Sequence, residues 1–284
     1  MTDTYYNYSE IDPVIKNALK EDIRSGDITT AATVSPRTGA NAVIIAKAKG
    51  ILAGINVCAR TFTLVNEKTS LFFPLEDGNE VTKGTEVLRI SGQASSILKS
   101  ERTALNILCR MSGIATMTRE AVNLVKGTKA VILDTRKTMP GLRILDKYAV
   151  TAGGGTNHRF GLYDMFLIKD NHIAAAGGIS NAVKRCIKYR AKKNLKSIII
   201  AEADTLKKAA DAAESGADRI LLDNMNPEQI KEVVNKLGGK VKLEVSGGIN
   251  LKNIRKYAET GVDHISMGML THSVPAVDFS LNFD

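Results

Sequence analysis

A basic stretch between residues 133 and 173 holds the side chains of this sequence that are best suited to chemistry. Arginine binds carboxylates and phosphates through two parallel hydrogen bonds, whereas a lysine ammonium acts as a compact point charge. Gathering several such cations is unfavourable unless an anion neutralises them, so the stretch predicts a site for an anionic ligand. Beside a triple glycine at 153–155, its basic residues are Arg136, Lys137, Arg143, His158, Arg159 and Lys169.

Two apolar runs bound this stretch and place its charges at the ends of strands. Residues 130–133 and 165–168 are unbroken apolar segments, as strands buried on both faces require. The first run ends in the letters DTRK and the second in KDNH. Because α/β enzymes bind their ligands beyond the carboxyl ends of parallel strands, we expect the basic residues to meet there.

From about residue 130 the sequence alternates between apolar runs and amphipathic helices, which is typical of a parallel α/β fold. Asn226 is expected to cap one helix that ends near Gly238, and Asn250 to cap another that ends near Gly261. The pattern alone leaves an incomplete barrel and a doubly wound open sheet as alternatives. The predicted strands are 130–134, 165–169, 197–202, 219–223, 241–245 and 264–267.

Residues 1 to about 113 have a different pattern and predict a mixed α+β unit. An amphipathic helix is expected near 11–19, and strands at 41–48, 71–73 and 85–90. Ser100 is expected to cap a further helix.

The other predicted strand ends carry carboxylates and glycines. Glu202 and Asp223 could act as a general acid/base pair, as magnesium ligands or as acceptors for ribose hydroxyl groups. The loop 246–248, with the sequence SGG, would let the backbone approach a phosphate, which the start of the next helix would stabilise. Together the strand ends are 134–137, 169–172, Glu202, 223–224, 246–248 and 267–268.

Four other polar residues are assigned less specific roles by the pattern. Asn171 and His172 either orient Lys169 or close the site. His264 is expected to be structural, and so is His272.

Composition narrows the class of ligand. The 284 residues carry a formal net charge of +9, which suits nucleic acid, an anionic membrane surface or small polyanions. Tryptophan is absent and aromatic residues make up 5% of the chain, which leaves little for base stacking. No apolar run approaches the roughly 20 residues that span a bilayer, and the polar N-terminus is not expected to be a secretory signal. Reduced thiols are expected, which predicts a cytoplasmic protein, at Cys58, Cys109 and Cys186.

Several sequence blocks resemble the quinolinate phosphoribosyltransferase family, the decarboxylating nicotinate-nucleotide pyrophosphorylases. The longest run contains DTRKT, PGLR, KYAV, GGGTNHR, GLYD and LIKDNHI. Shorter blocks at 21–30, 100–116, 221–224, 246–249 and 265–268 also resemble that family, so the likeness covers most of the chain.

The resemblance implies a fold and a reaction. The fold is an α/β architecture in which an incomplete parallel β/α barrel of six to seven strands is fused to an N-terminal α/β sandwich domain. The sandwich would comprise 1–113 and the C-terminal tail 270–284, and the barrel 114–269. The reaction transfers the phosphoribosyl group of phosphoribosyl pyrophosphate to quinolinate with decarboxylation, giving nicotinate mononucleotide, pyrophosphate and carbon dioxide in de novo NAD biosynthesis.

The resemblance also assigns roles to individual residues. Lys137, Lys169, Glu202 and Asp223 would be catalytic, and the two carboxylates would face the phosphoribosyl substrate and its Mg²⁺; no organic cofactor is expected. Arg102 would reach the active site of a partner subunit, so that activity requires a homodimer. The expected substrate-binding residues are Arg102, Thr135, Arg136, Lys137, His158, Arg159, Lys169, Glu202, Asp223, Ser246, Gly247, Gly248, Met267 and Gly268.

Three alternatives compete with this assignment. A molybdenum-linked paralogue shares the fold but lacks the TNHR–GLYD and KDNH blocks, which are intact here. Another phosphate-binding barrel enzyme is supported only by the SGG loop, and a nucleic-acid-binding module only by the net charge. One departure from the family pattern is Ile200, where many relatives carry a carboxylate, whereas Asp204 keeps the next such position.

Overall fold

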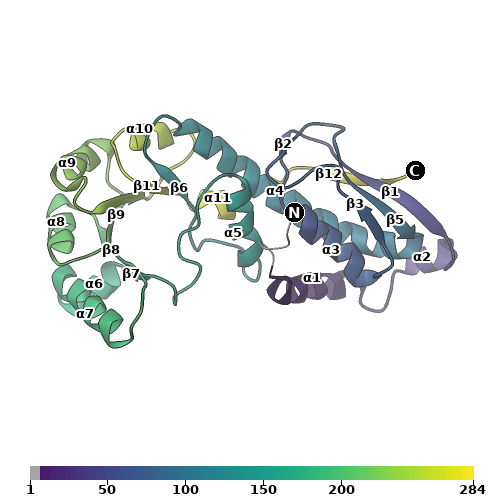
Figure 1. The fold of residues 1–284 in the computed structure, drawn as a ribbon, viewed down its shortest axis with the longest axis horizontal. Helices are drawn as coiled ribbons and strands as arrows, with labels where there is room; N and C mark the ends of the chain where they lie inside the picture. Colours follow the sequence, from purple (N-terminus) through teal and green to yellow (C-terminus); the bar gives the residue numbers. More distant parts are fainter. Residues whose placement is uncertain (1–6) are drawn as a thin grey trace. The chain divides into compact units, whose positions relative to one another are not determined.

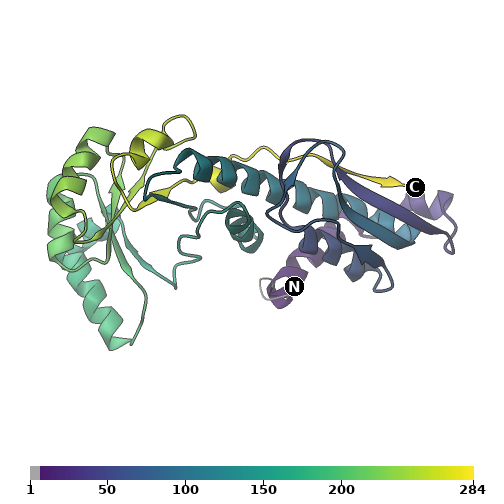
Figure 2. The same cartoon turned by 45° about the horizontal axis from the view of Figure 1, so that its top comes forward.

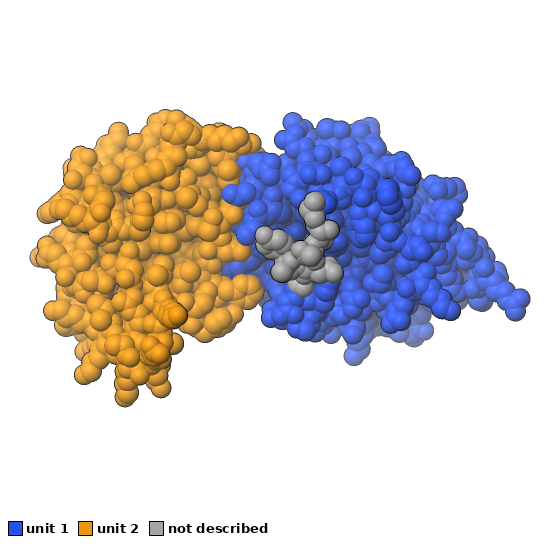
Figure 3. Space-filling view, in the orientation of Figure 1, with its two compact units in different colours: residues 1–119, 138–154, 271–284 blue, residues 120–137, 155–270 orange. Residues whose placement is uncertain are grey.

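The computed structural model describes residues 7–284 and divides into two compact units (Figure 3). Unit 1 comprises Met1–Arg119, Thr138–Gly154 and Thr271–Asp284, and unit 2 comprises Glu120–Lys137 and Gly155–Leu270.

The segment Thr138–Gly154 belongs to unit 1, although the predicted barrel of 114–269 included it. Its helix α5 (Arg143–Ala152) packs against α1 (Tyr8–Ile23), which the amphipathic pattern near the N-terminus had predicted. The buried face of α5 completes an apolar cluster with α1, and the residues that meet there include Ile11, Ile15, Leu145, Ala149 and Val150.

The core of unit 1 lies between an antiparallel sheet and two helices. The sheet has the strand order β12-β1-β5-β3, and alternate residues of β1 are buried against α3 and α4 (Figures 1 and 2). A separate two-stranded ladder pairs β2 with β4. The elements are α2 (Ile28–Thr33), β1 (Gly39–Ala46), β2 (Gly50–Ile51), α3 (Ile55–Val65), β3 (Ser70–Phe72), β4 (Glu80–Val81), β5 (Glu86–Gln93), α4 (Ala94–Leu124) and β12 (Phe279–Phe283).

Helix α4 begins at Ala94, so the predicted cap at Ser100 is wrong. Ser100 is fully buried inside the helix, and its hydroxyl donates to the carbonyl oxygen of Ser96 at 2.8 Å. At the true start, the amide of Ala94 donates to the carbonyl oxygen of Thr38 at 2.9 Å. A backbone carbonyl thus replaces the side-chain cap that would otherwise satisfy one of the first free amides.

Unit 2 is built on six parallel strands in the order β6-β11-β10-β9-β8-β7. All six strands were predicted to within two residues. Between residues 7 and 284 no pairing closes β6 onto β7, as expected for an incomplete barrel. The strands are β6 (Val131–Leu133), β7 (Phe166–Ile168), β8 (Ile199–Ala203), β9 (Arg219–Asp223), β10 (Lys242–Ser246) and β11 (His264–Ser266).

Helices of unit 2 lie outside this sheet (Figures 1 and 2). The predicted start of α9 is confirmed, because Asn226 accepts from the amide of Gln229 at 2.9 Å while the Gln229 side chain accepts from the amide of Asn226. The cap predicted at Asn250 is wrong. Asn250 accepts from the amide of Lys252 in a turn, and the helix starts at Ile254. The helices are α6 (Asp170–Ala176), α7 (Ile179–Lys192), α8 (Leu206–Glu214), α9 (Pro227–Leu237) and α10 (Ile254–Ala258); a short α11 (Met269–His272) follows β11.

In the described part of the chain, no helix is both long enough and apolar enough to span a membrane.

Candidate active site

The strand register of unit 2 brings the predicted carboxylates and the SGG loop to one edge of the sheet. Glu202 on β8 is level with Leu221 on β9, and Asp223 on β9 is level with Ser246 on β10. Because side chains alternate between the two faces of a strand, Glu202, Asp223 and Ser246 share one face. On the same edge, the amide of Met267 donates to the carbonyl oxygen of Leu133 at 2.9 Å.

Glu202 lies beside a lysine from the neighbouring strand end. The Lys169 ammonium is 3.7 Å from the Glu202 carboxylate. Burial raises the pKa of Glu202, Lys169 opposes this rise, and the nearby carboxylates of Asp223 and Asp170 add to it. Glu202 therefore gains from a further cation, and this is the environment of a carboxylate that meets a charged ligand.

Lys169 is held by the segment that follows it. The amide of Lys169 donates to Nδ1 of His172 at 3.0 Å, so His172 orients the start of α6. Asn171 is exposed, and its amide donates to Asp170. Of the two roles left open by the sequence, His172 takes the orienting one through the backbone of Lys169.

The SGG loop is locked against the end of β9. Gly247 has φ of +95°, and a Cβ atom there would lie 2.2 Å from Oδ1 of Asn224. Asn224 has φ of +54°; its amide donates to the Ser246 carbonyl oxygen at 3.0 Å, and its side chain donates to Asp223 at 2.7 Å. Glycine is therefore required at 247, where both the backbone and the close contact exclude a side chain.

The loop does not run directly into a helix, as the phosphate hypothesis had expected. Five residues separate Gly248 from α10, and the side chain of Asn253 donates back to the Gly248 carbonyl oxygen at 3.1 Å. A phosphate at this loop would thus meet its backbone amides without the aligned amides of a long helix.

Two cations of the basic stretch, Arg136 and Arg159, are partly buried and close enough to interact electrostatically. Arg159 is 7% exposed, and burial, together with the charge of Arg136, lowers the pKa of Arg159. The Nε atom of Arg136 is buried without a hydrogen-bond partner among the described residues. Lys137 is exposed, and its amide donates to the hydroxyl of Thr135 at 3.0 Å. Arg136 therefore has a buried donor without a partner among the described residues, and the pair Arg136 and Arg159 suits an anion.

His158 is buried and hydrogen-bonded within unit 2. Its amide donates to Asp134 at 2.7 Å, and its Nε2 lies 3.3 Å from Glu244. Glu244 is also bonded by Arg219 and Ser266. Sequence reasoning missed these three residues because it considered only the last residues of each strand. The period of two along β10, which places Glu244 on the same face as Ser246, could have found Glu244.

Arg102 belongs to unit 1, whereas the strand-end residues described above belong to unit 2. It is exposed on α4 and lines a cavity of about 300 Å³ in unit 1 together with Asp22, Asn106 and Arg110. Arg110 in turn forms a two-pronged ion pair with the buried Asp146, at 2.8 and 2.7 Å. Arg143 of the basic stretch also lies in unit 1, where its Nε donates to Thr138 at 3.0 Å.

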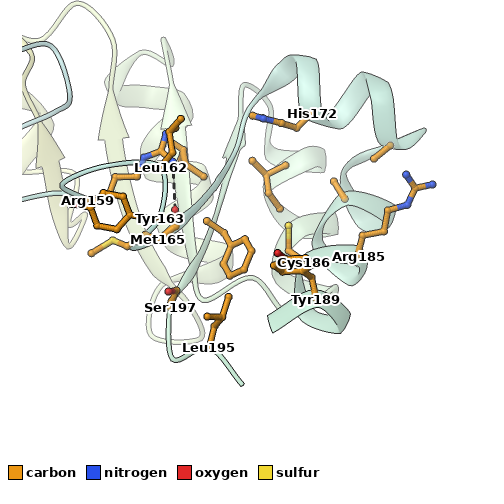
Figure 4. A pocket seen from close by; sticks show the side chains of 15 residues that line it. Arg159, Leu162, Tyr163, Met165, His172, Arg185, Cys186, Tyr189, Leu195 and Ser197 are labelled. Carbon is orange, nitrogen blue, oxygen red and sulfur yellow. Dashed lines mark hydrogen bonds between the residues drawn. The ribbon is translucent and has the colours of Figure 1, made fainter. Parts of the chain in front are cut away.

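A second cavity, of about 510 Å³, lies along the edge strand β7 (Figure 4). Arg159 and the loop residues Leu162 and Tyr163 border one side, and Cys186 and Tyr189 of α7 border the other. The guanidinium of Arg159 donates to the Met165 carbonyl oxygen at 3.4 Å. The cavity is mostly apolar, and the arginines in its lining are Arg159 and Arg185.

The carboxylates fit a metal that arrives with a substrate better than a resident ion. Throughout residues 7–284, no group of three or more His, Cys, Asp or Glu side chains could hold a metal. Mg²⁺ commonly binds one or two carboxylates together with substrate phosphates and retained water. Glu202 and Asp223 suit that arrangement. Ile200, which replaces a family carboxylate, is fully buried in β8.

A parallel α/β sheet with cations, carboxylates and a glycine loop at its carboxyl edge defines an enzyme-like protein that binds anions. Comparison with known proteins makes this specific. Residues 27–112 match the family model of the quinolinate phosphoribosyl transferase N-terminal domain, and residues 114–282 match that of the C-terminal domain. The chain belongs to the quinolinate phosphoribosyltransferase family.

Named relatives and solved structures agree with this membership. The chain is 41% identical over 276 residues to a probable nicotinate-nucleotide pyrophosphorylase (carboxylating) of Bacillus subtilis, covering 97% of this chain and 94% of the relative. It is 42% identical over 291 residues to the chloroplastic enzyme of Arabidopsis thaliana, covering 97% and 83%. The crystal structure of NadC from Streptococcus pyogenes superposes with a TM-score of 0.93 at 39% identity and covers 100% of both chains.

Proposed function

We propose that this chain transfers the phosphoribosyl group of phosphoribosyl pyrophosphate to quinolinate and releases carbon dioxide, which gives nicotinate mononucleotide for NAD biosynthesis. The observation that carries this proposal is the pair Arg136 and Arg159. Burial and the neighbouring Arg136 lower the pKa of Arg159. The Nε atom of Arg136 is buried without a partner in the described chain. A carboxylate would neutralise the first charge and accept from the second group. Quinolinate supplies two.

The reaction needs no nucleophile from the protein. The pyridine nitrogen of quinolinate attacks C1 of the ribose as the bond from C1 to pyrophosphate breaks. The ring nitrogen is then positively charged and stabilises the electron pair that stays on C2 when the bond to the carboxylate breaks and carbon dioxide leaves. A proton from solvent takes its place at C2. The chain therefore acts by positioning two polyanions and stabilising developing charge.

Each group of residues has a role in this chemistry. Arg136, Arg159 and Lys169 bind the carboxylates of quinolinate, and Lys137 lies at the pyrophosphate. Glu202 and Asp223 hold the ribose and its Mg²⁺, which when bound neutralises the leaving pyrophosphate. The backbone amides at Ser246, Gly247 and Gly268 bind the 5′-phosphate by donating hydrogen bonds to it, as glycine loops do in phosphate-binding barrels.

Assembly and location extend the proposal. Arg102 completes the quinolinate site of a partner subunit, so the active form is a homodimer. Arg102 is exposed on α4, which leaves its guanidinium able to do so. Cys58, Cys109 and Cys186 are all free thiols, which supports a reducing compartment such as the cytoplasm.

The direct test follows carbon. Purified protein is incubated with Mg²⁺, phosphoribosyl pyrophosphate and quinolinate labelled in its 2-carboxylate, and labelled carbon dioxide and nicotinate mononucleotide are measured. Release that requires both substrates supports the proposal. A protein that is folded but releases no label with both present would contradict it.

Lys169→Ala is expected to lower kcat/KM for quinolinate roughly 10²- to 10³-fold, because a carboxylate of the substrate loses its charge partner. The melting temperature is expected to change by no more than about 2 °C, since the side chain is 51% exposed and its contact with Glu202 is long. Steady-state kinetics and calorimetry check the two parts. Lys208→Ala is the matched control. It removes an exposed ion pair with Asp204, which follows strand β8, the strand that carries Glu202. This variant should keep its activity within about twofold of the wild type.

Arg159→Ala extends the same test to a buried position. Removing this cation relieves its repulsion with Arg136, so quinolinate binding should be lost while the melting temperature stays unchanged or rises. Isothermal titration with quinolinate measures the first and calorimetry the second. An unfolded variant would instead identify Arg159 as a partner in a structural ion pair.

A further inference from the structure

Glu244 occupies the interior of unit 2 and is the centre of a buried polar cluster. Its carboxylate is 0% exposed. Oε2 accepts from the guanidinium of Arg219 at 2.9 Å. Oε1 faces two other groups, Nε2 of His158 at 3.3 Å and the hydroxyl of Ser266 in a short hydrogen bond. The two oxygens therefore have separate tasks, since one balances a charge and the other faces His158.

The second ring nitrogen of His158 is also engaged. The amide of Arg159 donates to Nδ1 at 2.7 Å. A nitrogen that accepts a hydrogen bond carries no proton, so the arrangement assigns the neutral ring with its proton on Nε2. That proton points to Glu244. The ring thus links a buried carboxylate to the backbone of Arg159, whose guanidinium binds the anion in the proposed function.

We propose that Glu244 is a positioning residue for quinolinate, which holds the His158 ring in one tautomer and orientation and thereby fixes Arg159 in the anion site. This inference rests on the proposed function and names a residue that acts through another. Buried carboxylates that receive the N–H of an imidazole commonly fix its tautomer and ring orientation. Here the fixed ring of His158 accepts a hydrogen bond from the amide of Arg159, so its orientation also restrains the backbone of Arg159.

The charge state of Glu244 suits this task. Burial alone would raise the pKa of Glu244, but the hydrogen bonds from His158, Ser266 and Arg219 outweigh it and hold the pKa below its usual range. Glu244 is therefore an anion throughout the neutral range and only accepts hydrogen bonds. A partner that could donate would conflict with Nε2–H of His158 and with Arg219.

Glu244→Gln tests the proposal because an amide has one oxygen where the carboxylate has two. If the amide oxygen faces His158, the NH₂ group meets the Arg219 donor; if it faces Arg219, the NH₂ group meets Nε2–H. Ser266→Ala is the matched control, since it removes one donor from the same oxygen, Oε1, and leaves the bond from His158 in place.

Two measurements separate positioning from general support of the fold. Nitrogen-15 NMR of the histidine ring at pH 7.5 should show protonated Nε2 and unprotonated Nδ1 for His158 in the wild type and in Ser266→Ala, and a changed pattern in Glu244→Gln. Kinetics should show a KM for quinolinate raised roughly 10- to 100-fold in Glu244→Gln, with the KM for phosphoribosyl pyrophosphate within about twofold. Ser266→Ala should change each KM by less than about threefold.

The outcomes that overturn the proposal are distinct from those that overturn the proposed function. If His158 in the wild-type protein carries its proton on Nδ1, the role proposed for Glu244 is contradicted. This measurement needs no variant, so it holds even if Glu244→Gln fails to fold. An unchanged quinolinate KM in folded Glu244→Gln, or an equal rise in both KM values, would also contradict that role. A wild type that shows the expected ring pattern but releases no carbon dioxide from quinolinate would contradict the proposed function instead.

Discussion

Quinolinate is expected to be used at least roughly 10⁴-fold better than nicotinate, measured as kcat/KM with saturating phosphoribosyl pyrophosphate. Sites built around a particular polar group of the substrate reject analogues that lack it by about 10⁴ to 10⁵, because the buried groups of the site are left unpaired. Nicotinate lacks the 2-carboxylate, so Arg159, which is 7% exposed, and the partnerless Nε of Arg136 within the described chain would stay without an anion.

A variant sharpens this first expectation. Arg159→Ala should lower the use of quinolinate strongly and leave the slow use of nicotinate nearly unchanged, so the preference collapses. Competition assays with both substrates at once measure the ratio directly. Equal use of the two substrates by the wild type would show that the basic residues do not bind the 2-carboxylate.

Mixing two inactive variants is expected to restore about a quarter of wild-type activity. Arg102→Ala and Lys169→Ala homodimers should each be nearly inactive, because every active site lacks one cation. In a two-fold symmetric dimer each subunit gives and receives the same contact. A heterodimer therefore collects both lesions in one site and leaves the other intact. At equal amounts about half of the dimers are mixed, each with one working site of two.

Native mass spectrometry under exchange conditions provides the control for this mixing experiment. Wild-type protein mixed with Lys169→Ala sets the scale for subunit exchange. If heterodimers form and the mixture stays inactive, Arg102 acts within its own chain or has no role in the reaction. Restoration above the background of either variant alone is the result that a shared site requires.

Much of unit 2 was predictable because its signals are local. The start of α9 is fixed by contacts within four residues, among Asn226, Pro227 and Gln229. Each buried parallel strand forms an apolar run that can be recognised without reference to the other strands. The strand-end residues followed from those runs, since a polar group after a buried strand marks its carboxyl end. Lys169, Glu202 and Asp223 were found in this way, and the register then placed the two carboxylates on one face.

The errors share a physical cause, which is that distant contacts override local preference. Ser100 is a good cap by composition, yet the carbonyl oxygen of Thr38 caps the helix six residues earlier. The apolar face of α5 predicts burial without indicating which unit buries it. Glu244 was missed because only the last residues of each strand were considered, and its burial depends on His158 and Arg219, which come from other parts of the chain.

The pairing of β12 with β1 has a consequence for the order in which the protein folds during its synthesis. Phe283 is level with Ala42 and Phe279 with Ala46, so β12, which is synthesised after every other described strand, completes a sheet that begins with β1. At about 5–20 residues per second, β1 waits roughly 10 to 50 s for this neighbour, which follows the last strand of unit 2 by only about 1 to 3 s. One edge of β1 is exposed to other nascent chains during that interval. The sheet of unit 1 is therefore completed after the six strands of unit 2 have been made. Loss of β12 (Phe279–Phe283) would leave one edge of β1 permanently unpaired and open to association with other chains.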